Sequence, residues 1–252
     1  MDSKVHRYIS LFVNGKTNKL RKVDCVGMEI AARIFCLVLG YCLGLIQTSY
    51  IYGKLHGIDI REYGSGNAGT TNALRVLGKK AGLVVFLGDF FKAAIACILA
   101  RYIGVHFFHD IMYPMILWAG FGVVIGHNYP FYMGFKGGKG IAATAGVIFG
   151  TLDWRIMAVC LVSFIVVVAA TRYVSLGSLV VVTLFFLTFL CLGMCGKMIN
   201  PVTRTPYNGK DLIESYIIIF LFGGLAFYRH KANIVRLMNG EENKISFKKN
   251  AD

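Results

Sequence analysis

Residues 141–171 read IAATAGVIFGTLDWRIMAVCLVSFIVVVAAT and are apolar except around Asp153-Trp154-Arg155 near their centre. A helix crosses a bilayer with about 20 residues, so this segment is long for one crossing. Charged side chains are costly in lipid but are common in a turn at the membrane surface. The segment is therefore predicted to cross twice, with a turn near Asp153. Its first crossing should be short and should take residues from the stretch before it.

The composition of the whole chain agrees with a membrane protein. Of the 252 residues, 56% are hydrophobic and 16% are charged, whereas a soluble domain carries about 25% charged residues. Besides the two crossings in 141–171, apolar segments occupy residues 28–52, 81–105, 111–126, 173–195 and 212–228. We predict an all-α polytopic integral membrane protein with about seven transmembrane helices, some of them short.

The number of crossings decides which polar segments share a side of the membrane. With seven, the loops at 53–80 and 127–140 and the tail after residue 228 all face one side, whereas six would put the tail opposite. All three segments are net positive, so the positive-inside rule predicts the cytoplasmic side for them. The basic segment 1–27 then lies outside, against the same rule. That conflict weakens if translation starts at Met28.

Three parts of the chain are expected to differ in role. Residues 1–27 form a basic extension that is not part of the membrane fold, residues 28–244 form the membrane domain, and residues 245–252 form a polar tail. The formal charge is +14, but no compact soluble segment remains to bind nucleic acid. We therefore attribute the excess charge to basic cytoplasmic loops and an anionic substrate.

Residues 135–140 read FKGGKG and combine two lysines with three glycines between apolar segments. Glycines let the backbone approach a ligand, and lysines add fixed positive charge, which together suit a phosphate. The alternative is a plain basic loop. A P-loop is excluded because Gly140 follows Lys139, where Ser or Thr would hold magnesium. The spacing Gly64-x-Gly66-x-x-Gly69 is not a dinucleotide fingerprint either, because a membrane helix and no strand precedes it.

Residues 64–72 read GSGNAGTTN and place hydroxyl and amide donors among glycines. Arg75 follows closely and adds a forked cation suited to phosphate oxygens. An ordinary polar turn is the alternative, but this density of donors favours a site. Ser65 has no Gly-x-Ser-x-Gly context, so a phosphate contact suits it better than a nucleophilic role.

Two charged residues fall inside an apolar segment. Asp89 and Lys92 are three residues apart and share one helical face, so they are expected to pair, to lie near the end of the helix or to face the protein interior. A structural or supporting role is favoured over direct substrate contact. His127 is a single histidine near the membrane surface, which is more often structural than catalytic.

The basic tail carries the remaining candidates. His230 gains weight because Asn233 lies one turn later on the same face of a helix. Glu242 either binds substrate or pairs with a basic side chain and fixes the tail, and the structural role is slightly favoured.

Taken together, these segments resemble the bacterial acyl-phosphate-dependent glycerol-3-phosphate acyltransferase family. The first matching motif is residues 64–72 with Arg75, and the second is residues 126–130 (GHNYP) followed by 135–140. The third is residues 230–237 (HKANIVRL) with Gly240 and Glu242. The resemblance spans roughly residues 40–244 with the motifs in order. Ala68 stands where the family usually has Pro, and Thr70 where Ala is common.

The resemblance implies a reaction. An acyl phosphate would donate its acyl group to the 1-hydroxyl of sn-glycerol 3-phosphate, giving lysophosphatidic acid and inorganic phosphate in the first acylation of phospholipid synthesis. It implies a multi-pass protein of the bacterial inner (cytoplasmic) membrane without metal or cofactor. It also implies a functional link to the enzyme that makes acyl phosphate from acyl carrier protein thioester. The residues alone leave a transporter for a phosphorylated or anionic metabolite as an alternative, although no inverted repeat is visible.

The resemblance also assigns roles to the candidate residues. The catalytic set is Ser65, Arg75, Lys139, His230 and Asn233. The substrate-binding set is Gly64, Gly66, Asn67, Thr71, Asn72, Lys136, Gly137, Gly138, Gly140 and Glu242. The proton of the 1-hydroxyl would pass to His230 or to a phosphate oxygen of the donor. The second route is favoured because no carboxylate is evident to orient His230, and no covalent acyl-enzyme is expected.

Overall fold

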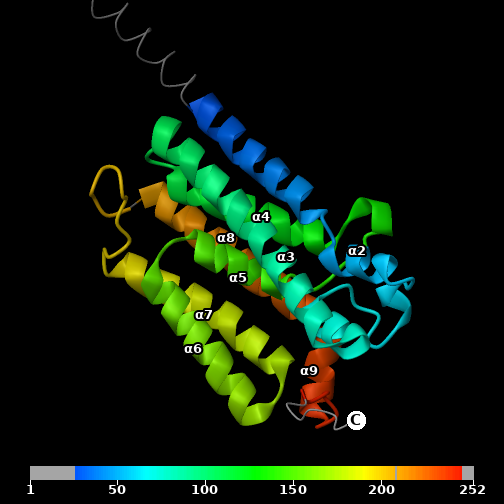
Figure 1. Cartoon of the computed structure of the whole chain (residues 1–252). Coiled ribbons are helices and arrows are strands. Elements are labelled where there is room, and N and C mark those ends of the chain that lie inside the picture. Colours follow the sequence, from blue (N-terminus) through cyan, green and yellow to red (C-terminus); the bar gives the residue numbers. More distant parts are fainter. Residues whose placement is uncertain (1–25, 208, 246–252) are drawn as a thin grey trace, which may run out of the picture.

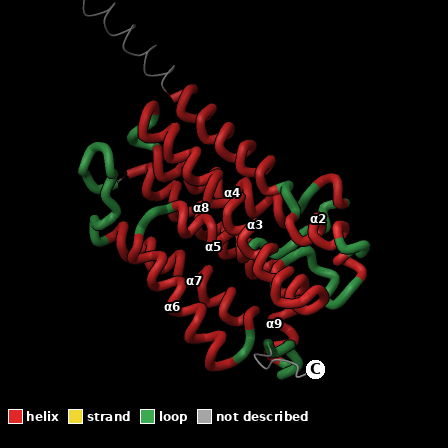
Figure 2. The backbone as a smooth tube through the Cα atoms, in the orientation of Figure 1, coloured by secondary structure: helices red, strands yellow, loops and turns green. Residues whose placement is uncertain are grey.

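The structure, a computed structural model, describes residues 26–207 and 209–245. These residues form tilted helices packed side by side (Figure 1) and no extended strand (Figure 2). The helices are α1 (residues 26–44), α2 (Thr48–Leu55), α3 (Thr70–Phe107), α4 (Met112–Asn128), α5 (Ile141–Gly150), α6 (Trp154–Thr171), α7 (Val174–Met194), α8 (Gly209–Arg229) and α9 (Lys231–Met238). The predicted extension at 1–27 and tail at 245–252 lie outside the described residues, except for residues 26, 27 and 245.

Five helical segments of the described chain are long and apolar enough to cross a membrane. They are Val26–Leu55, Thr70–Phe107, Trp154–Thr171, Val174–Met194 and Gly209–Arg229. α4 and α5 are shorter, with 17 and 10 residues, or about 25 and 15 Å. With them the chain alternates seven times between two ends of the bundle, and the all-helical membrane fold is confirmed.

The polar segments are sorted between these two ends. One end, here called the site end, gathers the segments around residues 53–69, 129–140, 172–173 and 230–245 (Figure 1). Hydrogen bonds join them, such as Ile245 N to Arg172 O at 2.9 Å. The opposite end gathers the connections after α3, α5 and α7, where Asn200 Nδ2 donates to His109 O at 2.8 Å. The prediction that three basic segments meet at one end is confirmed.

The turn between α5 and α6 lies where its charged residues predicted it. Asp153 caps α6 by accepting from Arg155 N at 3.0 Å, and the two side chains pair at 2.6 Å. The carboxylate therefore satisfies orphan N–H groups of the helix start. The prediction that the short crossing takes residues from the stretch before it is wrong. The loop ends at Gly140, whose φ of +78° lies in the left-handed region, and α5 begins only at Ile141.

The first apolar segment is not one continuous helix, contrary to the prediction for residues 28–52. It breaks at residues 45–47 between α1 and α2. Gln47 is fully buried at the break, and its amide donates to Gly126 O at 3.3 Å and His127 O at 3.0 Å. The break therefore fastens α1 to the end of α4, where the second polar loop begins.

The long part of α3 begins after Gly78, close to the predicted residue 81. α3 includes two turns, Thr70 to Leu77, that join the long helix at Gly78 with φ +86°. The kink folds these turns back, so that Leu74 packs against Gly82. Asn72 and Arg75, expected in a loop, thus lie on a short helical segment anchored to the membrane helix.

Candidate active site

Among the described residues, α3, α5, α7 and α9 begin at the site end. The residues that precede their first turns are Gly69 of α3, Gly140 of α5, Tyr173 of α7 and His230 of α9. The first backbone N–H groups of a helix are unpaired and carry the positive end of the helix dipole. Convergence of these helix starts, together with the basic side chains, makes this end of the bundle suited to an anion.

The three polar segments, residues 53–80, 127–140 and those after 228, are here called the first, second and third. The glycine pair of the second segment has no room for side chains. Gly137 N and Gly138 N donate to Asn128 O and His127 O, both at 3.1 Å. A Cβ at Gly138 would overlap the His127 ring and the Ala68 carbonyl. The pair of residues Gly137-Gly138, here called the glycine loop, is thereby held against α4 on one side and the first polar segment on the other.

Arg229 ties the glycine loop to the third segment. Its Nη2 atom donates to Gly137 O at 3.0 Å and to Gly138 O at 2.7 Å. Both carbonyls of the glycine loop therefore accept from this guanidinium, which adds a positive charge beside the loop. The electropositive character of the loop is correspondingly strengthened.

A chain of hydrogen bonds links the second and third segments. Lys139 Nζ donates to Asn233 Oδ1, and Asn233 Nδ2 donates to Glu242 Oε1 at 2.7 Å. Glu242 also accepts from Ser175 Oγ at 3.0 Å and Arg236 Nε at 2.9 Å. Its side chain is only 6% exposed. Glu242 thus fixes the orientation of the Asn233 amide, which in turn presents an oxygen to Lys139.

The ammonium of Lys139 is unusually easy to deprotonate. Burial lowers its pKa to about 8, Glu242 opposes the shift, and three arginines add to it. These are Arg236 and Arg229 of the third segment and Arg75 of the first, so charges from both other segments act on this one group. Several cations around a single partly buried lysine are the arrangement expected where an anionic ligand supplies the missing negative charge.

His230 is buried and neutral. Its Nδ1 atom lies 2.8 Å from Ala226 O, and because a carbonyl can only accept, this nitrogen carries the proton. Burial and the nearby Lys139 charge lower the pKa of His230 to about 4. The unprotonated Nε2 can therefore accept a hydrogen bond, but it is a weak base at neutral pH.

The first segment is braced by Asn72, which is 2% exposed. Its Oδ1 accepts from Ser65 N at 2.8 Å, and its Nδ2 donates to Ile60 O and Tyr63 O at 3.1 and 3.0 Å. The amide is thus occupied within the loop, and a direct substrate contact by Asn72 stays a prediction. The side chains of Ser65 and Arg75 are exposed and free to meet a ligand.

The remaining predicted residues are less tightly integrated. Gly64 and Gly66 have φ of +60° and +67° and shape the first loop. Thr71 and Lys136 are exposed, Asn67 is half-buried, and Gly140 precedes α5. Their roles as substrate-binding residues stay predictions.

Several residues of this region carry no assignment from the sequence. They are Arg229, Arg236 and Ser175, whereas the sequence favours a structural role for His127. Arg229 directly precedes His230 in the basic tail, which is the one signal that could have drawn attention to it. Ser175 is 67 residues from its partner Glu242, so nothing local in the sequence joins them.

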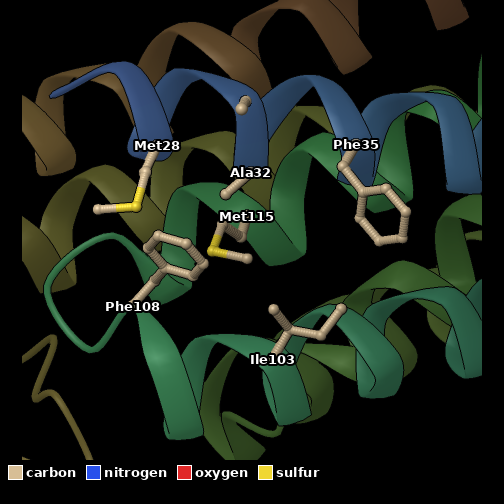
Figure 3. A pocket seen from close by; sticks show the side chains of 7 residues that line it. Met28, Ala32, Phe35, Ile103, Phe108 and Met115 are labelled. Atoms are coloured by element: carbon tan, nitrogen blue, oxygen red, sulfur yellow. The ribbon is translucent and has the colours of Figure 1, made fainter. Parts of the chain in front are cut away.

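An apolar cavity of about 350 Å³ lies elsewhere, between α1, α3 and α4 near the opposite end (Figure 3). Met28, Phe35, Phe108 and Met115 are among the side chains around it. It offers no polar group to a phosphate, so it is separate from the cationic region.

The fold and the cationic site end define a multi-pass helical membrane protein with a site suited to phosphate-bearing ligands. A family model described as glycerol-3-phosphate acyltransferase matches residues 34–240. This range lies inside the predicted membrane domain at 28–244. The chain is similar to the glycerol-3-phosphate acyltransferase of Clostridioides difficile, with 41% identity over 227 residues that cover 88% of this chain and 100% of the relative. The enzyme of the same description from Chlorobaculum parvum is 40% identical over 225 residues, covering 84% and 95%.

The chain is also similar to a solved structure. The crystal structure of PlsY, an integral membrane glycerol 3-phosphate acyltransferase in its glycerol 3-phosphate form, superposes with a TM-score of 0.71. The two chains are 32% identical, and the match covers 85% of this chain and 96% of the other. The chain belongs to the glycerol-3-phosphate acyltransferase family and is an integral membrane acyltransferase.

Proposed function

We propose that this protein transfers a fatty acyl group from a long-chain acyl phosphate to the 1-hydroxyl of sn-glycerol 3-phosphate. The hydroxyl oxygen bonds to the acyl carbon, and the bond from that carbon to the phosphate oxygen breaks. The products are lysophosphatidic acid and inorganic phosphate, which takes up the hydroxyl proton. The observation that carries this proposal is the Lys139–Asn233–Glu242 chain surrounded by three arginines, because both substrates bring phosphate to one cationic site.

The proposal divides the site among named groups. Lys139 and Arg75 hold phosphate oxygens, and Ser65 with its glycine neighbours contacts the acyl phosphate. His230 and Asn233 orient glycerol phosphate through Nε2 and the fixed amide. A phosphate leaving group needs no strong general acid, and the apolar faces of the helices accommodate the acyl chain beside the site. No acyl-enzyme and no metal or cofactor takes part.

A donor comparison tests this function. Purified protein in detergent should form lysophosphatidic acid from glycerol 3-phosphate and palmitoyl phosphate, whereas palmitoyl-CoA and acyl carrier protein thioester should not replace that donor. The donor preference would place the protein after the enzyme that makes acyl phosphate from the thioester. A transporter of anionic metabolites would form no product, and equal use of palmitoyl-CoA would exclude the proposed donor.

The proton acceptor is proposed to be the departing phosphate and not His230. A phosphate monoester has a second pKa of about 6, whereas the pKa of His230 is about 4. The phosphate is therefore the stronger base. His230→Gln, which keeps a polar group near the Nε2 position, should retain turnover within about threefold at saturating substrate and raise KM. A loss of kcat beyond about 100-fold, the range of general-base catalysis, would make His230 the base.

The pH dependence of the reaction should follow Lys139. The group is charged below pH 8 and neutral above it, and only the charged form attracts a phosphate. The value of kcat/KM, which reports the free enzyme, should therefore fall about tenfold per pH unit above pH 8. Phosphate monoesters are fully ionised there, so substrate charge stays constant. Lys139→Arg should remove this decline, and a wild-type profile that is flat to pH 10 would contradict the assignment.

We also propose that the site end faces the cytoplasm. Its first loop alone carries Lys54, Arg61, Arg75, Lys79 and Lys80, and basic residues favour the inside. The opposite end would then be outside, where Cys195 is exposed after α7. In a variant with Cys195 as its only cysteine, a membrane-impermeant maleimide should label Cys195 in cells whose outer layers have been removed and whose cytoplasmic membrane is intact. Labelling that requires lysis would reverse the orientation.

A further inference from the structure

A buried ionic cluster lies directly behind the glycine loop. Lys92 Nζ is 2.8 Å from Asp89 Oδ1 and 3.0 Å from His127 Nδ1. The three side chains are 1–3% exposed. Removing charges from water is expensive, and a buried ion pair often stabilises a protein no more than apolar residues of the same volume. A gain in stability alone therefore gives little account of this cluster, and its location becomes informative.

The cluster joins the break after α1 to two neighbouring helices. Lys92 Nζ also donates to Gly44 O at 3.3 Å and Ile46 O at 2.6 Å, carbonyls at the break. Thr48 Oγ1 at the start of α2 donates to Asp89 Oδ1 at 3.3 Å. The ammonium thus uses its donors to hold α1 and α3 around the end of α4, where His127 lies.

These contacts decide which nitrogen of His127 carries the proton. A lysine ammonium can only donate, so its 3.0 Å contact assigns Nδ1 as the acceptor and leaves the proton to Nε2, whereas Asp89 Oδ1 lies farther from the same nitrogen, at 3.5 Å. Nε2 is the atom that a Cβ at Gly138 would overlap, and the Ala68 carbonyl borders the same space. The edge of the imidazole ring therefore packs against the glycine loop, next to the first polar segment.

We infer that His127 is a positioning residue for the glycine loop, and that Asp89 and Lys92 set its tautomer and place. The inference rests on the proposed function and names a residue group that supports its phosphate site without touching the reacting atoms. A small displacement of a preorganised site costs binding of the ligand it fits. Lys139 directly follows the glycine loop, so a displacement of the loop would also move the cation at the centre of the site.

The test compares His127→Asn with Gly138→Ala. Asn keeps a side-chain oxygen near the position of Nδ1 for Lys92 but removes the ring edge under Gly138. Gly138→Ala disturbs the same contact from the other side. Each variant should raise about tenfold the KM for one of the two substrates, glycerol 3-phosphate or palmitoyl phosphate, and the affected substrate should be the same in both variants. The value of kcat should change less than threefold. The double variant should be no worse than the more affected single one, because both remove one contact.

Two further variants separate positioning from general loss of structure. Asp89→Asn should raise the same KM with a smaller effect, since it removes the charge that pairs with Lys92 but leaves the His127 ring beside Gly138. Trp118→Phe removes a 2.6 Å hydrogen bond to Glu214 at the opposite end and should leave both KM values unchanged. Three results would overturn the inference. The effects of His127→Asn and Gly138→Ala on KM would multiply in the double variant, or the two variants would raise KM for different substrates. The third result is a lower melting temperature with unchanged KM values. Absence of turnover in the wild type would instead refute the proposed function.

Discussion

Lys139→Met should lower kcat/KM for acyl transfer by about 10²–10³-fold, the cost of losing one donor to developing or bound negative charge in a preorganised site. The methionine is similar in length to lysine but removes the ammonium on which charges of the first and third segments act. It also leaves Asn233 Oδ1 without its lysine partner. Steady-state release of phosphate from palmitoyl phosphate measures the effect.

Lys231→Met is the matched control for this variant. Lys231 lies at the same end, in the first turn of α9, but is exposed and lies near the Tyr228 ring. Its removal should change kcat/KM less than threefold, because an exposed charge is screened by solvent and salt. Equal losses in the two variants would show that general positive charge at this end, and not the placed ammonium of Lys139, supports the reaction.

Glu242→Ala should impair both stability and activity. The substitution removes the acceptor of Ser175, Asn233 and Arg236. Ser175 and Asn233 are buried, and an unpaired buried donor costs about 1–3 kcal/mol, whereas water can solvate the more exposed Arg236 side chain. The Asn233 amide loses its fixed orientation, so kcat/KM should fall about 100-fold. Loss of the Glu242 charge, which raises the pKa of Lys139, should also move the alkaline decline of activity below pH 8.

The neighbouring residue provides the control for Glu242. Glu241 is exposed, and Glu241→Ala should leave the melting temperature and kcat/KM close to the wild type. Glu242→Gln should be intermediate, since its amide oxygen can still accept from Asn233 but carries no charge. If Glu242→Ala behaved like Glu241→Ala, the hydrogen-bond chain from Glu242 to Lys139 would have no part in the site.

The helical membrane architecture could be predicted from the sequence because charged residues within an apolar segment are costly in lipid and must lie at a turn or in the protein interior. Asp153 and Arg155 had to lie at a turn, and that turn made the number of crossings odd. The odd number brought residues near 65, 139 and 230 to one end, as the structure has them. This inference needed only the cost of charge in lipid and the length of a crossing.

The details of the site depended on partners distant in sequence. The break at residues 45–47 contains neither proline nor glycine, and it is held by Lys92 and by contacts of Gln47 with α4. Glu242 acquires its place from α7 and α9, and Arg229 from the glycine loop. Such tertiary contacts leave no periodic or local signal. The sequence could predict the Asp89–Lys92 pair and a basic partner for Glu242, but not the contacts of these residues with distant helices.

Single turnover of palmitoyl phosphate with excess protein and saturating glycerol 3-phosphate tests the central claim most directly. Lysophosphatidic acid and inorganic phosphate should appear with the same rate constant and in equal amounts, with no acyl group on the quenched protein. Lys139→Met should slow both products alike. Phosphate that appears ahead of lysophosphatidic acid, together with acylated protein, would contradict direct transfer at the site where the three segments meet.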